Sequence, residues 1–340
     1  MTRALPAFLL LFVLTALSAA AQAAEGDSSG NTSADGSLNK LLARASEAVR
    51  SETYRGIIVY LREGELDTLR VIHRMRDGLE QERLVSLTGQ PREVIRRGGV
   101  VTSILPQNKV VLISQRKHDG LLGSVAQFSA DRMGEHYRLT DMGQRRLADR
   151  VGRLISIEPL DGYRYGYRML IDDTTHLPLK LDLISDNNVL EQLMFTQIDF
   201  PKSIEDDEFE PGYNIDGFRV VKHQAVQVED KPVPEDAWKP TDLPPGFQLA
   251  EDGVRRVTES GFVRQMLFTD GVAAVSAFIA PAGLRKPLEG ATTMGAVNAY
   301  GHVVEDTQIT VVGEVPARTV KRIAENLVRE TQSASRDGSP

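Results

Sequence analysis

The feature that most constrains this chain is an alternation of apolar and mostly polar residues between positions 163 and 200. The alternating apolar residues are Tyr163, Tyr165, Tyr167, Met169 and Ile171, and then Leu177, Leu179, Leu181 and Leu183. A period of two places alternate side chains on opposite faces of an extended strand. The stretch therefore predicts antiparallel strands with one apolar face.

The same pattern occurs upstream, where short apolar runs between residues 54 and 114 are separated by turn sequences such as "RDG" and "PQN". Short strands at hairpin spacing predict an antiparallel meander. A helical apolar spacing over residues 38–51 predicts one amphipathic helix that packs on the sheet. Residues 117–135 interrupt the strand pattern and predict a short helix or a loop over the sheet. These elements form a predicted large domain over residues 38–215.

A change of composition predicts a second domain. Residues 216–242 are rich in proline and charge and are interpreted as a linker. Beyond them, Asp270-Gly271 between two apolar runs predicts a hairpin, a second hairpin follows near residues 297–316, and residues 317–330 have helical spacing. We expect a small α+β domain over residues 243–330 and a disordered tail over 331–340.

The N-terminus predicts export. Arg3, an apolar stretch from Ala4 to Leu17 and the small residues Ala21 and Ala23 are typical of a signal peptide over residues 1–23. Residues 24–37 are interpreted as a disordered spacer. The chain has no cysteine and a net charge of −7, which disfavours disulfides and nucleic-acid binding. A bacterial periplasmic protein fits these observations.

The sequence contains no phosphate-binding loop, nucleophile elbow or zinc-ligand motif, and its six histidines are scattered. We expect no catalytic residues, no metal and no cofactor, and an exported hydrolase is the disfavoured alternative. The carboxylates of residues 205–210 predict a solvated acidic loop, because calcium-loop spacing is missing.

Two residue groups are candidates for binding. Four arginines form a candidate site for anionic groups, with ordinary solvent-facing side chains as the alternative: Arg145, Arg146, Arg150 and Arg153. Six apolar or aromatic residues are candidates for lining a cavity that accepts an acyl chain: Tyr60, Tyr163, Tyr165, Tyr167, Leu179 and Leu181. The alternative for the tyrosines is a core under the helix. One short helix is a small cover for so many strands, which favours a partly open cavity.

Several motifs in this order resemble the RseB/MucB family of periplasmic negative regulators of the envelope-stress sigma factor. They are "YRGIIVY", "VIHRM", "RLVSL", "REVIRR", "YRYGYRMLIDDTTHLPLKLDLI", "LEQLMFTQIDF", "LPPGF", "FTDGVAAVSAFI" and "TVVGEVP". Two positions depart from the family pattern, because His176 and Asp149 stand where glycine is common. If the backbone at His176 needs a positive φ, histidine tolerates it less easily than glycine.

The resemblance implies a mainly β, α+β fold: a large curved antiparallel half-barrel similar to lipoprotein carriers, and a small α+β domain. It implies binding to the periplasmic domain of an RseA/MucA-like anti-sigma factor, protection of that partner from proteolysis, and release by lipopolysaccharide or another acyl lipid. It points to the small domain for partner contact, here Leu243, Phe247, Phe262 and Phe268, and it suggests a homodimer. The alternative is a periplasmic lipoprotein or lipid carrier, which the second domain disfavours.

Overall fold

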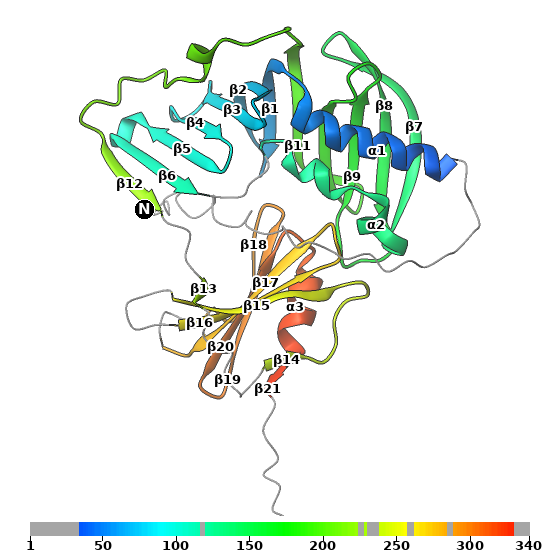
Figure 1. Ribbon diagram of the computed structural model, residues 1–340. Helices are drawn as coiled ribbons and strands as arrows, with labels where there is room; N and C mark the ends of the chain where they lie inside the picture. The colour runs from blue at the N-terminus through cyan, green and yellow to red at the C-terminus, as the bar shows by residue number, and fades with distance from the viewer. Residues whose placement is uncertain are drawn as a thin grey trace, which may run out of the picture. The chain divides into compact units, whose positions relative to one another are not determined.

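The structure is a computed structural model, and it describes residues 34–115, 120–223, 228–229, 238–256, 262–283 and 288–329. The chain divides into two compact units, residues 1–225 and 226–340 (Figure 1). The predicted signal peptide and the whole predicted tail lie outside the described residues, as do residues 224–227 and 230–237 of the predicted linker. Within the described ranges, no helix is long and apolar enough to cross a membrane.

The first unit is built on a twelve-stranded sheet with the order β12-β6-β5-β4-β3-β2-β1-β11-β10-β9-β8-β7. The strands are β1 Tyr54–Arg62, β2 Glu65–Arg76, β3 Leu79–Ser86, β4 Glu93–Arg97, β5 Val100–Leu105, β6 Val110–Gln115, β7 Tyr137–Leu147, β8 Arg150–Pro159, β9 Gly166–Asp172, β10 Pro178–Ser185, β11 Asn188–Asp199 and β12 Arg219–His223. Neighbouring strands are antiparallel except β12, which runs parallel to β6. Because β12 and β7 occupy opposite ends of this order, the sheet is open, and the predicted mainly β fold is confirmed.

The strand around residue 163 begins later than the alternation predicts. β9 starts at Gly166, so Tyr163 and Tyr165 lie in the bend before it. The backbone N–H of Tyr163 donates to the Asp161 carboxylate at 2.9 Å, and Arg164 pairs with the same side chain. An aspartate that bonds the backbone two residues onward stabilises a turn against extended structure. The prediction of a strand from Tyr163 is therefore wrong by three residues.

A long helix lies across one face of this sheet. α1 spans Ala34–Ser51, four residues more than predicted at its N-terminal end, and crosses several strands (Figure 1). Its Leu42 and Ala45 are fully buried, as is Ile58 of β1. We call the face that carries Tyr54, Ile58 and their cross-strand neighbours the inner face, and the opposite side the outer face.

The connection between β6 and β7 contains short helices, in the region predicted as a short helix or a loop. They are η3 Gly123–Gln127, α2 Ala130–Met133 and η4 Gly134–His136, and a further short helix, η2 Pro106–Asn108, joins β5 to β6. β6 is next to one edge of the sheet and β7 forms the other edge. Because Phe128 contacts Tyr167 and α1 contacts η3, this connection crosses the inner face.

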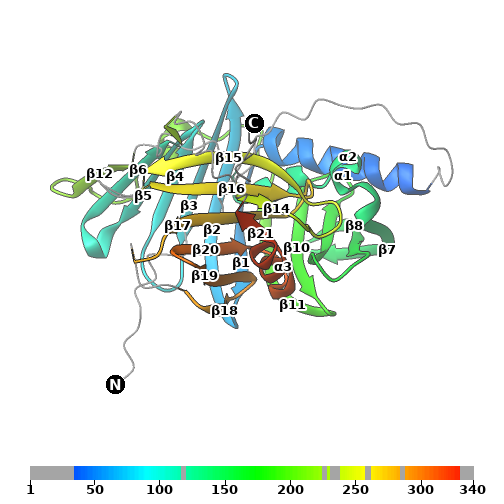
Figure 2. The same cartoon turned by 90° about the horizontal axis from the view of Figure 1, so that it is seen from below.

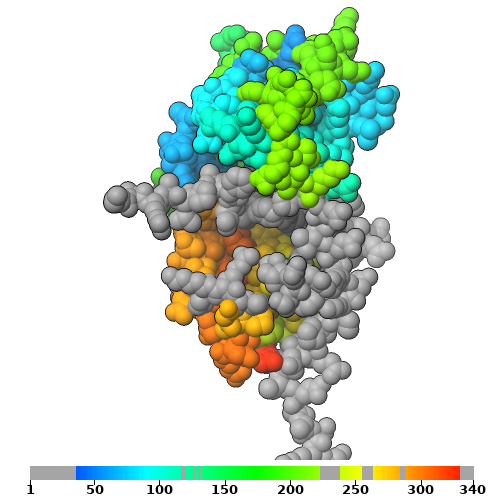
Figure 3. Space-filling view, turned by 90° about the vertical axis from the view of Figure 1, so that its left-hand side faces the viewer, coloured from blue at the N-terminus to red at the C-terminus, as the bar shows by residue number. Residues whose placement is uncertain are grey.

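Residues 201–218, which we call the strap, cross the outer face between β11 and β12 and contain η5 Asp206–Phe209. The space-filling view shows the yellow-green end of this unit resting on its cyan strands (Figure 3). Phe209 is fully buried against Ile72 and Ile204, and the Arg74 guanidinium lies 4.4 Å from its ring centre.

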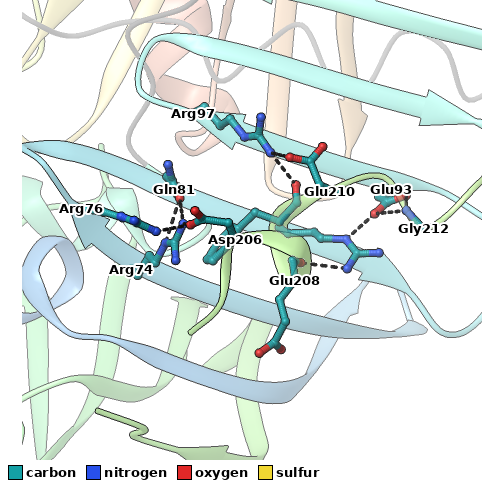
Figure 4. Close-up of polar contacts among 11 residues, drawn as sticks. Arg74, Arg76, Gln81, Glu93, Arg97, Asp206, Glu208, Glu210 and Gly212 are labelled. Atoms are coloured by element: carbon teal, nitrogen blue, oxygen red, sulfur yellow. Dashed lines mark hydrogen bonds and ion pairs between the residues drawn. The ribbon is translucent and has the colours of Figure 1, made fainter. Parts of the chain in front are cut away.

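Four arginines of β2 to β4 hold the strap (Figure 4). Arg74 and Arg76 both pair with Asp206, while Arg83 donates to the Glu208 carbonyl at 2.9 Å and Arg97 to the Phe209 carbonyl at 3.1 Å. The strap also donates a hydrogen bond to the sheet, from the Gly212 N–H to the fully buried Glu93 at 3.0 Å. The predicted acidic loop is exposed at Asp206 and Glu210, but both carboxylates are paired with arginine.

The second unit contains a seven-stranded sheet with the order β13-β15-β16-β17-β20-β19-β18. Its elements are β13 Val228–Glu229, β14 Trp238–Pro240, β15 Gln248–Arg256, β16 Phe262–Thr269, β17 Ala274–Pro281, β18 Gly290–Met294, β19 Val297–Val304, β20 Thr307–Gly313, α3 Ala317–Glu325 and β21 Leu327–Arg329. α3 lies along this sheet (Figure 2) and buries Val320 and Ile323. The predicted helix over 317–330 ends five residues early, because Leu327–Arg329 pair with Trp238–Pro240 instead.

Candidate ligand-binding face

Strand register brings part of the predicted cavity residues together on the inner face. Tyr60 pairs with Leu193, Leu193 pairs with Leu181, and Leu181 pairs with Met169 across four neighbouring strands. Met169 is fully buried and Leu193 is 8% exposed, whereas Tyr60 and Leu181 are half-buried. Side chains directly opposite in antiparallel strands are neighbours on one face. Tyr60 therefore lies at the β1 end of this row, whereas Leu181 lies between two buried neighbours.

Tyr167 occupies the same face, two residues before Met169. The Phe128 ring meets it edge-on with 4.7 Å between ring centres, so the β6–β7 connection packs directly on this predicted residue. The other three candidates differ. Tyr163 and Tyr165 precede β9, and the fully buried Leu179 lies at the irregularity in the β9–β10 pairing, next to Pro178.

A polar group adjoins the apolar row at its β1–β11 end. The Tyr60 hydroxyl donates to the Glu191 carboxylate, and Arg62 Nε lies 3.4 Å from the same carboxylate. Glu191 and Arg62 are cross-strand partners whose side chains are 13% and 24% exposed. The inner face is therefore amphipathic at this margin, with a tyrosine that contacts both kinds of surface.

A buried charge cluster lies on the inner face of β2 to β4; its members are His73, Glu80, Glu82 and Arg96. The two ring nitrogens of His73 lie 2.8 Å from the Glu52 carbonyl and 3.2 Å from Glu80 Oε1. Arg96 pairs with Glu80 and lies 3.7 Å from Glu82. Both His73 nitrogens thus face oxygen atoms, one of the backbone and one of a carboxylate.

The surroundings of this cluster change its acid–base chemistry. Burial raises the pKa of the Glu82 carboxyl, although the charge of Arg96 and the N–H of Leu121 oppose that effect. Burial acts in the same direction on Glu80, but hydrogen bonds from His73 and Arg96 outweigh it and lower the pKa of that carboxyl. Burial and the nearby glutamates raise the pKa of the Tyr54 hydroxyl well above its usual value. Tyr54 also stacks on His73 with 4.9 Å between ring centres.

The four predicted anion-binding arginines lie on or beside the β7–β8 hairpin. Arg146 pairs with Asp149 and Arg153 with Asp141, and Arg145 donates to the Gln144 carbonyl at 2.8 Å. Arg150 donates to both oxygens of the buried Asp172, at 2.8 and 2.7 Å. Three of the four thus already contact a carboxylate, and an anionic ligand would have to compete with it.

The predicted partner-contact residues belong to the second unit. Phe268 is fully buried and Phe247 is 6% exposed, both in the core that α3 covers, and Leu243 packs against that core. Phe262 begins β16, opposite Arg256. The buried members can shape a partner surface but do not present one, and their role in contact stays a prediction.

Sequence reasoning missed the buried charge cluster and the arginines that hold the strap. The members of the charge cluster are spread over three strands, and only the register places His73 opposite Glu82 and Glu82 opposite Arg96. One sequence signal existed, since Glu80 and Glu82 are two residues apart and so share a face of their strand, although nothing local identifies their partners. Within the described residues, no group of histidine, aspartate and glutamate is arranged to hold a metal ion.

An open, helix-covered sheet joined to a smaller sheet unit defines a two-domain binding protein. The chain belongs to the MucB/RseB family: the MucB/RseB N-terminal domain matches residues 37–213 and the MucB/RseB C-terminal domain matches residues 232–328. The resemblance read from the motifs is thereby confirmed.

The relatives are named regulators. The chain is 32% identical over 297 residues to the sigma factor AlgU regulatory protein MucB of Pseudomonas aeruginosa, covering 83% of this chain and 88% of that protein. It is 27% identical to the sigma-E factor regulatory protein RseB of Salmonella typhimurium, covering 88% and 93% respectively. Among solved structures, it resembles the MucA/MucB complex of P. aeruginosa with a TM-score of 0.67 and 28% identity, covering 87% of this chain and 99% of the matched chain. A structure of MucB gives a TM-score of 0.58, with 29% identity and 88% and 100% coverage.

Proposed function

We propose that this chain restrains an envelope-stress sigma factor by binding the periplasmic domain of a membrane anti-sigma factor and shielding it from proteolysis. The similarity to MucB in complex with MucA, which covers 87% of this chain, carries the proposal. The signal-peptide pattern supports a periplasmic location. A homodimer stays a prediction.

The second unit is the proposed source of the partner surface. Because Phe247 and Phe268 are buried, exposed apolar side chains near them must make the contact. Leu249 is 41% exposed and pairs with Phe268 in the sheet, which makes it the first residue to test. Because directly opposite side chains share a face, Leu249 lies beside the buried Phe268, where it can receive a partner's apolar side chain.

Calorimetry of residues 24–340 with the periplasmic domain of the cognate anti-sigma factor tests this proposal. A charge placed in an apolar contact should weaken binding by about ten-fold or more, so Leu249→Asp should show that loss. Leu66→Asp is the matched control, because Leu66 is 62% exposed at a hairpin end of the first unit. Absence of binding by the wild type would refute the regulator, and equal affinities of the two variants would remove Leu249 from the surface.

The second part of the proposal is release by a lipid with acyl chains, such as lipopolysaccharide. It rests on the inner face, where Tyr60, Tyr167 and Leu181 lie half-buried beside fully buried apolar residues. A lipid can shift the binding equilibrium only if it binds the free protein better than the complex.

Lipid binding is tested with the fluorescent fatty acid cis-parinaric acid. Leu181→Asp should weaken its binding by about ten-fold or more, because a carboxylate would be placed against the chain. Val189→Asp is the control from the same hairpin, since Val189 is 38% exposed. Uptake of the fatty acid without binding of the anti-sigma factor domain would favour a periplasmic lipid carrier. A wild-type protein that takes up no fatty acid would refute the proposal that a lipid releases the partner.

A further inference from the structure

The segment Gly120–Phe128, which we call the lid, is the uncharged part of the connection that crosses the inner face. The sequence "GLLGSVAQF" has no titratable side chain. Leu122, Val125 and Phe128 are 1%, 0% and 1% exposed. Their spacing of three residues matches the period of the 3₁₀ helix that the lid contains, so the three side chains share one face. The lid therefore packs against the rest of the unit through one apolar face.

The first end of the lid is fastened to the buried charge cluster. The Leu121 N–H donates to both oxygens of Glu82, at 3.0 and 3.3 Å. Gly120 passes so close that a Cβ atom there would lie 2.6 Å from Glu82 Oε1 and would also collide with Arg96. The backbone of Gly120 is outside the left-handed region, so a larger residue is disfavoured here by the close approach and not by the backbone conformation. The hydrogen bonds to Glu82 therefore hold this end of the lid on the sheet.

The other end of the lid rests on apolar contacts. Phe128 packs edge-on against Tyr167, a residue of the proposed lipid-binding face. η3 also contacts α1, whose C-terminal end is held by the same cluster through the Glu52 carbonyl and His73. Apolar contacts can be replaced by an acyl chain at little cost, whereas the Glu82 contact cannot.

We propose that Gly120–Phe128 is a movable lid over the inner face, and that the His73–Glu80–Glu82–Arg96 cluster is the latch that an entering acyl chain must open. This inference rests on the proposed lipid binding. Glu82 positions the lid through Leu121, Arg96 lies 3.7 Å from Glu82, and Glu80 in turn pairs with Arg96 and His73. Opening breaks one charge-assisted hydrogen bond and exposes Tyr167.

The surroundings of Glu82 act in both directions on its carboxyl. Burial raises the pKa of Glu82, whereas the charge of Arg96 and the N–H of Leu121 oppose that rise. The charged or titratable groups that face Glu82 are His73, Glu80 and Arg96, together with Tyr54, and the lid adds none.

Hydrogen exchange on the protein of residues 24–340 tests the latch. Gly120→Ala should speed exchange of the Leu121 amide and the rest of the lid by about ten-fold or more, because the added methyl separates Leu121 from Glu82. Glu82→Gln should have a smaller effect, since a neutral amide oxygen can still accept the Leu121 N–H in place of the carboxylate. Gly36→Ala in α1 is the control, because its added Cβ meets nothing within 4 Å.

Stopped-flow mixing with cis-parinaric acid tests the gating. Association should be faster for Gly120→Ala than for wild type by about the factor found in lid exchange, and Gly36→Ala should match wild type. Unchanged lid exchange in Gly120→Ala would overturn the latch. Faster exchange with an unchanged association rate would overturn the lid as a gate. Wild-type protein that takes up no fatty acid would instead refute the lipid part of the proposed function, and the gate with it.

Discussion

The strap provides the sharpest test of the fold, through Phe209→Ala. Phe209 is fully buried, packs on Ile72 and Ile204, and has the Arg74 guanidinium 4.4 Å from its ring centre. Loss of a buried phenylalanine costs about 3–5 kcal/mol, and loss of a cation–π contact to a largely buried arginine adds about 1–2 kcal/mol. The free energy of unfolding of the first unit should therefore fall by about 4–7 kcal/mol.

The single tryptophan makes this measurement specific to each unit. Trp238 is buried in the core of the second unit, so its fluorescence reports unfolding of that unit, while circular dichroism reports both. In urea, Phe209→Ala should move the dichroism transition of the first unit to lower concentration and leave the Trp238 transition in place. Phe209→Leu is the matched variant and should cost only about 1–2 kcal/mol.

Two results would refute this reasoning. A change below about 1 kcal/mol for Phe209→Ala would mean that the arginine contacts hold the strap without its aromatic anchor. An equal shift of the Trp238 transition would mean that the two units unfold as one, contrary to their division into separate compact units.

Two further predictions concern the loop between β9 and β10. Asp172 accepts hydrogen bonds from Arg150, from the backbone N–H of Thr175 and from the Thr175 hydroxyl, so Asp172→Asn should destabilise the first unit by about 2–4 kcal/mol in urea unfolding. Although burial opposes it, bonding to Arg150 and Thr175 lowers the pKa of Asp172, so this contribution is present above the ordinary aspartate range and lost as pH falls through the lowered value. The difference in unfolding free energy between wild type and Asp172→Asn should therefore shrink on acidification. The control is Asp173→Asn, which should change stability little because Asp173 is exposed. A stability difference for Asp172→Asn that stays constant down to acid pH would contradict the role given to the Asp172 carboxylate. His176 has a φ of 61°, so His176→Gly should be neutral or should stabilise the first unit by up to about 1 kcal/mol in thermal unfolding. His176→Val should destabilise it, because a β-branched residue tolerates this backbone poorly. The opposite order of the two variants would show that contacts of the histidine side chain outweigh its backbone strain.

Both positions at which this chain lacks a common family glycine have a left-handed backbone. The positive φ of His176 lies at the position where the sequence departs from a common glycine, and Asp149, the other departure, has a φ of 61° as well. Both residues therefore bear a left-handed backbone that glycine would adopt without a steric cost. Since such costs are about 1 kcal/mol, surrounding hydrogen bonds can offset them, as the His176 N–H does by donating to the Asp172 carbonyl at 3.0 Å.

What the sequence by itself determined is the local structure and the two-unit organisation. Alternation of apolar residues fixed the strands from β1 to β6, because a period of two leaves only one way to bury one face. The Asp270-Gly271 turn and the spacing of Val320 and Ile323 similarly fixed a hairpin and a helix of the second unit. Each of these signals lies within a few residues of chain, where covalent geometry limits the choices.

Only the tertiary structure decided which distant residues meet. Arg74 and Asp206 are 132 positions apart, and Tyr60 and Glu191 are 131 apart, so no local pattern could pair them. The same holds for Leu121 over Glu82, where a backbone N–H and a buried carboxylate come together because the β6–β7 connection crosses the sheet. Strand order and register set these contacts, and both depend on the free energy of packing the whole unit rather than on any single segment.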